Sequence, residues 1–156
     1  MKPSARAIRE MPGIARKGQP GSGSGTSLGL QASRPADLIR EVERGFSFRL
    51  LKTFAAATGL PVSRIASLLN LPERTLARRR VSGRLAPDES ERLLRLARVF
   101  DKAVALFEGD ATAAMAWLTS PRKALGAESP LAYSRTELGA REVENLMGRL
   151  EYGVFS

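Results

Sequence analysis

The chain has 156 residues, of which 43% are apolar and 6% aromatic, so it is large enough for one or two small helical units with a modest core. It contains no cysteine and no histidine, which excludes disulfide bonds, zinc ligation by these side chains, thiol nucleophiles and imidazole catalysis. The other reactive side chains form no paired-carboxylate motif, no glycine-rich phosphate loop and no nucleophile elbow. We therefore expect a protein that is not an enzyme and that has no metal and no cofactor.

The formal net charge of +9 is concentrated in the middle of the chain. Residues 46–100 hold 11 basic and 4 acidic residues, a net charge of +7, whereas residues 101–156 have a net charge of −2. A basic segment of this kind fits DNA, RNA or an anionic surface, and a solvated basic face without a partner stays open as well. No apolar run is long enough for a membrane span or a signal peptide, so we expect a cytoplasmic protein with no membrane partner.

Residues 1–45 are predicted to be a flexible basic leader. Scattered lysines and arginines are followed by a glycine- and serine-rich stretch at residues 18–25, which has too few apolar side chains to order itself. A short helix is expected around residues 37–44. The leader is open to two interpretations, a DNA-seeking arm and a segment without a function of its own.

From Phe46 onward, apolar residues repeat at helical spacing and predict a helix-turn-helix. A first helix starts at Phe46 and ends at Gly59. A short second helix has an apolar stripe with the spacing i, i+3, i+4, i+7, formed by Val62, Ile65, Ala66 and Leu69. A break at residues 70–72 then leads into a third helix from Glu73 to about Arg80. Two short helices joined by a three-residue turn are the signature of this DNA-binding motif.

The third helix has the composition of a recognition helix, the one that enters the major groove. Arg74 and Arg78 are four residues apart and share a face, so we expect them on base edges with Thr75 beside them, while Arg79, Arg80 and Arg84 meet phosphates. A solvated arginine-rich helix and an RNA-binding helix are the alternative interpretations. The predicted DNA-binding residues are Arg74, Thr75, Arg78, Arg79, Arg80, Ser82 and Arg84.

Three further helices are predicted in the C-terminal half. A long helix opens at Pro87 with acidic residues in its first turn, and a short one over residues 111–118 contains Trp117, which we assign to the core. In the last helix, Ser134 and Glu137 form a predicted capping box. Its buried stripe is Val143, Leu146, Met147 and Leu150.

The last helix is expected to end near Tyr152–Gly153 and to leave Val154, Phe155 and Ser156 as an apolar end. An exposed apolar end either binds a partner protein or packs back on the protein's own core. The residues alone do not distinguish these two possibilities.

Several stretches of this chain, taken together, resemble the Xre-type antitoxins of the MbcA/ParS/Xre group. The resemblance covers about residues 46–156. In the helix-turn-helix region it rests on Leu68-Leu69-Asn70-Leu71-Pro72-Glu73-Arg74-Thr75-Leu76 and on residues 90–99. In the C-terminal region it rests on Ala116-Trp117-Leu118, Ala124-Leu125-Gly126, Ser129-Pro130-Leu131, Gly139-Ala140-Arg141-Glu142-Val143 and Leu150-Glu151-Tyr152-Gly153-Val154.

The resemblance implies an all-α fold, with an Xre/Cro-like helix-turn-helix for DNA binding and dimerisation at residues 46–108 and a helical toxin-binding domain at 109–156. It implies a type II antitoxin whose partner is a RES-domain toxin that degrades NAD. In such antitoxins a homodimer binds operator DNA and represses its own operon, and the C-terminal segment blocks the toxin's active site. Carried over to this chain, the toxin-binding residues are Arg149, Glu151, Tyr152, Gly153, Val154, Phe155 and Ser156.

Three alternatives remain beside this hypothesis. One is a stand-alone helix-turn-helix transcriptional regulator without a toxin partner. Another is an enzyme inhibitor in which the arginines from Arg78 to Arg80 only make a helix soluble. The third is an enzyme, which activity of the purified chain on NAD without a partner would indicate.

Overall fold

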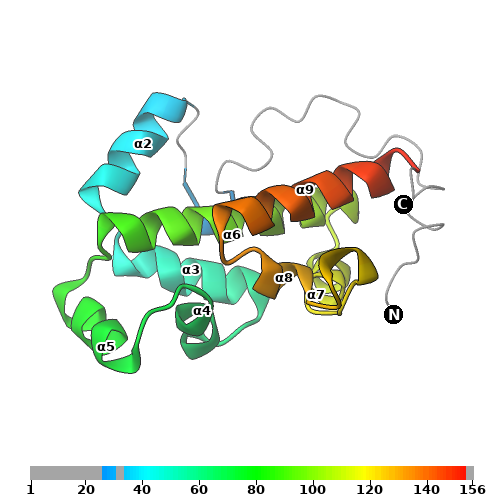
Figure 1. The fold of residues 1–156 in the computed structure, drawn as a ribbon. Helices are drawn as coiled ribbons and strands as arrows, with labels where there is room; N and C mark the ends of the chain where they lie inside the picture. The colour runs from blue at the N-terminus through cyan, green and yellow to red at the C-terminus, as the bar shows by residue number, and fades with distance from the viewer. Residues whose placement is uncertain (1–25, 31–33, 154–156) are drawn as a thin grey trace.

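The structure is a computed structural model and describes residues 26–30 and 34–153. Within these residues it is all-helical, as the sequence predicts, and the only β-type pairing is an isolated bridge between Ser47 and Arg84 (Figure 1). In chain order the elements are η1 (Thr26–Leu28), α2 (Pro35–Arg44), α3 (Phe48–Thr58), α4 (Val62–Leu68), α5 (Glu73–Ser82), α6 (Pro87–Leu106), α7 (Ala111–Leu118), η2 (Lys123–Leu125), α8 (Pro130–Tyr133) and α9 (Glu137–Glu151).

The long helix α6 is the centre of the fold. It packs against α7 and α9 in the C-terminal half and against η1, α2 and α3 in the N-terminal half. Its fully buried side chains include Leu93, Leu96 and Val99, and the ring of Phe100 meets that of Phe54 edge-on with centroids 5.8 Å apart. Both halves of the chain therefore share one hydrophobic core built around α6.

Helices α3, α4 and α5 form the predicted helix-turn-helix region. Gly59 ends α3 in the left-handed conformation (φ 76°), as its position in the sequence predicts. The turn between α4 and α5 contains Asn70 at φ 57°, a conformation that asparagine tolerates better than most residues. Leu69 and Leu71 are buried on either side of Asn70, so the turn is held by the core.

The short helix α7 also agrees with prediction. Asp110 caps it by accepting a hydrogen bond from the N–H of Ala113 at 3.0 Å. Trp117 is buried in the core, and the guanidinium of Arg122 lies 5.0 Å from the centre of its ring. Burial lowers the pKa of Arg122 from its ordinary value.

The start of α9 differs from the predicted capping box. Thr136 caps the helix by accepting from the N–H of Gly139 at 3.0 Å, whereas Ser134 is fully buried and donates to the carbonyl of Pro130 at 2.7 Å. The prediction of Ser134 as the cap is therefore wrong. The reason is that α8 ends just before Ser134, whose hydroxyl is satisfied within that turn.

Residues 26–30, which lie within the predicted leader, pack against the folded body. Leu28 is fully buried where η1 packs against α3 and α6, and the N–H of Ser27 donates to the carboxylate of Asp101 at 3.2 Å. These residues join the folded body because Leu28 fills a site in the core, which average composition does not reveal. Helix α2 forms as predicted, and residues 1–25 lie outside the described part. In the described part, no helix is both long and apolar enough to cross a membrane.

Candidate functional site

Helix α5 packs against the core with only one of its faces. Leu76 is its one buried residue, and Gly83 ends the helix at φ 80° with its N–H donating to the carbonyl of Arg79. A helix turns by about 100° per residue, so Arg74, Arg78 and Val81 project on the side away from Leu76. All three are exposed, and neither arginine forms an ion pair with a described residue. The face expected to read base edges is therefore open.

Arg79 has a different environment from the other arginines of α5. Its Nε donates to Oε1 of Glu89 at 2.8 Å and its Nη2 donates to Oε2 at 3.0 Å. Burial opposes the charged form of Glu89, but the hydrogen bonds from Arg79 and from the N–H of Ala86 outweigh it and lower the pKa of Glu89. The hydrogen bonds that Arg79 donates to the carboxylate of Glu89 raise the pKa of Arg79 from its ordinary value. Arg79, expected on a phosphate, thus joins α5 to α6.

The other predicted DNA-binding residues surround the end of α5. Arg80 lies with its guanidinium 5.6 Å from the ring centre of Phe48, and Arg84 donates to the carbonyl of Gly45. The hydroxyl of Ser82 donates to the carbonyls of Arg79 and Arg84, both at 3.3 Å. The structure brings the seven predicted residues together on and around one helix, with Arg79 directed inward and Thr75 half-buried.

The predicted toxin-binding residues begin at the end of α9. Arg149 and Glu151 are half-buried, and Tyr152, which caps the helix, is 71% exposed. Gly153 follows at φ 72°, in agreement with the predicted helix end. The predicted stripe of Val143, Leu146, Met147 and Leu150 is buried as a whole. Val154, Phe155 and Ser156 lie outside the described residues.

Ion pairs hold α9 along α6. Arg98 donates to the carboxylate of Glu144 at 2.9 Å and lies 3.3 Å from that of Glu137, which also pairs with Arg95 at 3.2 Å. Glu144 is largely buried and also has Lys102 at 3.8 Å. The long helix therefore fixes the direction in which the end of α9 points.

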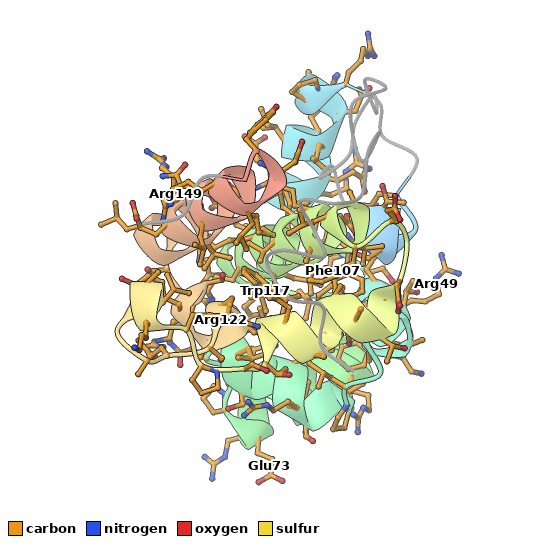
Figure 2. The ribbon with its side chains drawn as sticks, turned by 90° about the vertical axis from the view of Figure 1, so that its right-hand side faces the viewer. Arg49, Glu73, Phe107, Trp117, Arg122 and Arg149 are labelled. Atoms are coloured by element: carbon orange, nitrogen blue, oxygen red, sulfur yellow. The ribbon has the colours of Figure 1, made fainter. Side chains whose placement is uncertain are left out.

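The two candidate surfaces lie far apart. In Figure 1, α5 is at the lower left and the end of α9 is at the far right. Figure 2 shows Glu73, the first residue of α5, at the bottom and Arg149 at the upper left, with Trp117 and Phe107 between them. The two surfaces therefore do not overlap.

A basic helix-turn-helix joined by one long helix to a helical C-terminal unit defines a two-domain regulatory protein of the helix-turn-helix class. Residues 37–98 match the family described as the antitoxin Xre-like helix-turn-helix domain, and residues 102–153 match the antitoxin Xre/MbcA/ParS C-terminal toxin-binding domain. The chain is 44% identical over 130 residues to antitoxin Xre of Yersinia enterocolitica serotype O:8 / biotype 1B, a match that covers 83% of this chain and 88% of the relative.

It is also 45% identical over 74 residues to antitoxin Xre of Photorhabdus laumondii subsp. laumondii, covering 47% of this chain and 50% of that relative. The chain belongs to the Xre antitoxin family, as the resemblance in its sequence indicated. It carries the helix-turn-helix domain and the toxin-binding C-terminal domain of these antitoxins.

Two residues of these surfaces were not singled out from the sequence. The sequence places Glu89 only in the acidic first turn of its helix, although its side chain is buried and pairs with Arg79. Val81 has no role among the predicted site residues, although it follows Arg74 by seven residues and so shares its face. The spacing of Val81 was a usable signal, whereas nothing in the spacing of Glu89 shows its partner.

Proposed function

We propose that this chain is the antitoxin of a type II system whose toxin is a RES-domain protein that degrades NAD. The C-terminal segment blocks the toxin's active site, and a homodimer of the chain binds operator DNA and represses its own operon. Residues 46–108 serve DNA binding and dimerisation, and residues 109–156 serve toxin binding. The observation that carries the proposal is the exposed end of α9 within a domain of the toxin-binding family.

The end of α9 has the properties of a docking point. Tyrosine and arginine are the residue types that contribute most at protein interfaces, and Tyr152 and Arg149 lie within one turn of each other. Leu150 and Met147 anchor the same turn in the core, so little conformational entropy is lost when a partner binds there. Val154 and Phe155 follow this fixed point in the sequence.

The separation of the two surfaces supports repression by the complex. Because α5 and the end of α9 lie at opposite ends of the molecule, the residues proposed to bind toxin do not overlap the arginines of the recognition helix. Toxin and operator can then be held at the same time. The proposal assigns no chemical step to the chain itself.

Co-expression with the RES-domain product of the adjacent gene tests the proposal. Cells carry the toxin with the full chain, with a chain lacking residues 154–156, or with a full chain in which Arg74 and Arg78 are both changed to Ala. We expect a stable complex with the full chain, a fall in cellular NAD only with the truncated chain, and normal NAD with the double variant.

Each contrary outcome identifies what fails. Full protection by the truncated chain would overturn the blocking role of the C-terminal segment. Absence of any complex, with steady NAD and retained operator binding, would leave a stand-alone transcriptional regulator. Loss of NAD on adding the purified chain without toxin would show an enzyme.

A further inference from the structure

Val81 is the most exposed large apolar side chain of the described residues. It is 90% exposed and lies in the last turn of α5. The other large apolar side chains on the surface of the described part are Ile39 on α2, Leu138 on α9 and Tyr152, which caps α9. Burial in the core therefore does not explain this residue.

Helix formation does not explain it either. Valine loses side-chain freedom in a helix, and alanine is preferred at an exposed helical position. Ala77, one turn earlier on the same side of α5, is exposed too. A valine at position 81 thus lowers the stability of the free protein relative to alanine. We therefore look for its role in a complex with a partner.

The neighbours of Val81 indicate the kind of partner. At about 100° per residue, Arg74, Ala77, Arg78 and Val81 lie within an arc of about 100°. Val81 and the small side chain of Ala77, flanked by two arginines, do not make the contiguous apolar patch of a protein interface. The two arginines on the same face favour a polyanion as the partner. A polyanion that also presents an apolar group could contact Val81 as well as the arginines.

Thymine presents such a group, because its 5-methyl projects into the major groove and distinguishes it from cytosine. The rise of about 1.5 Å per residue places Val81 about 10 Å along the helix from Arg74. Base pairs are spaced at about 3.4 Å, so the two side chains are about three base pairs apart where α5 follows the groove.

We propose that Val81 is a specificity-determining residue whose methyl groups contact the 5-methyl of a thymine, about three base pairs from the base that Arg74 reads. The inference rests on the proposed binding of operator DNA. It adds a thymine requirement to a surface that otherwise offers only hydrogen-bond donors and charge.

The test removes the methyl group from the DNA. The full chain first selects its binding site from a pool of random DNA duplexes, and each thymine of that site is then replaced in turn by deoxyuridine, which lacks only the methyl. Dissociation constants are measured for the wild type, for Val81→Ala and for Ile39→Ala. Ile39 is a matched control because it is also an exposed apolar side chain on a helix, 56% exposed on α2.

We expect one thymine in each half-site whose replacement weakens wild-type binding about fourfold, which corresponds to one buried methyl group. Val81→Ala should bind the thymine and uracil versions of that position equally well, and Ile39→Ala should keep the fourfold difference. Because alanine is the better helix former, the Val81→Ala variant is expected to fold.

The same uracil profile in the wild type and in Val81→Ala would overturn the inference, and so would a change in oligomeric state of Val81→Ala without a change in DNA preference. In both cases the operator binding proposed above survives. If the wild type selects no DNA sequence, the DNA-binding half of the proposed function and this inference fail together.

Discussion

Arg79 and Glu89 form a two-point ion pair between α5 and the first turn of α6. The distances are 2.8 Å from Nε to Oε1 and 3.0 Å from Nη2 to Oε2, and Oε1 also accepts from the N–H of Ala86 at 2.8 Å. A guanidinium held at two points fixes the rotation of its helix as well as its position. The pair therefore supports the orientation that the burial of Leu76 gives α5, in which Arg74 and Arg78 face outward.

Replacing Glu89 by Gln is expected to lower the free energy of unfolding by about 2 kcal/mol, since it leaves a charged guanidinium without its carboxylate. Urea unfolding at pH 7 measures the loss. The replacement Glu91→Gln, on the exposed side of α6, is the control and should change stability by less than about 0.5 kcal/mol. Equal effects of the two changes would show that the ion pair contributes nothing.

The same carboxylate predicts a pH dependence of stability. The pKa of Glu89 is lower in the folded protein, so its contribution is fully present above the unfolded-state pKa of about 4.3 and is lost as the pH falls through the folded value. The difference in unfolding free energy between the wild type and Glu89→Gln should therefore shrink below about pH 4. A difference that stays constant from pH 7 to pH 3 would contradict the assignment.

Changing Arg74 and Arg78 to Ala is expected to weaken operator binding by about 1 to 3 kcal/mol for each arginine, without a change in thermal stability, because both side chains project into solvent. The affinity of the wild type for operator DNA should fall steeply between about 50 and 200 mM salt, because binding of arginines to phosphates releases counterions from the DNA. Fluorescence anisotropy with the selected DNA measures both. Arg141→Ala on α9 is the control, and an equal loss there would point to a general charge effect.

Two glycines of α9 give opposite predictions. A Cβ at Gly139 would overlap the backbone carbonyl of Tyr133, whereas a Cβ at Gly148 meets nothing within 4 Å. We expect Gly139→Ala to destabilise the fold by about 1 to 3 kcal/mol and Gly148→Ala to stabilise it by about 0.5 to 1 kcal/mol. Thermal unfolding of the two variants checks this, and a shift in the same direction for both would contradict the close packing of α8 on α9.

The ion pair of Arg98 with Glu144 is expected to contribute measurably, because it is partly buried and lies in a network. A double-mutant cycle with Ala at both positions should give a coupling of about 1 kcal/mol. The exposed pair of Arg34 with Asp37 should show no measurable coupling in the same experiment. Absence of coupling in both pairs would show that the pair of Arg98 with Glu144 adds nothing to the packing of α9 on α6.

Leu28→Ala is expected to cost about 2 to 4 kcal/mol, since the side chain is fully buried and alanine would leave a cavity. Leu138→Ala is the matched change at an exposed position and should cost less than about 0.5 kcal/mol. Chemical denaturation of the two variants makes the comparison. A small effect at Leu28 would show that the residues before α2 are not part of the folded body.

Helix positions were predictable because their signals are local. The apolar stripe of α9 and the breaks at Gly59 and residues 70–72 depend on spacing and on residue types that end or begin helices. The cap of α9 was placed wrongly at Ser134 because two hydroxyl residues, Ser134 and Thr136, both precede it, and only the end of α8 decides between them.

The parts that were not predictable depend on contacts between elements. Glu89 suits the positive end of a helix dipole, and nothing in its spacing from Arg79 shows that the two side chains meet across a turn. The burial of Leu28 depends on a site formed by α3 and α6, which lie later in the chain. Composition and spacing located the basic face of α5, and the three-dimensional structure separated its outward arginines from its inward one.

The two family domains are not joined by a loop: residues 98 and 102, where one match ends and the next begins, both lie within α6. Because both domains share the 20 residues of α6, the length of this helix limits how domains of related antitoxins can be combined. Inserting one residue at the junction would rotate everything downstream by about 100° and shift it by about 1.5 Å. A chimera that joins the DNA reader of one antitoxin to the toxin binder of another must therefore be spliced in register within α6, with no change in the length of that helix.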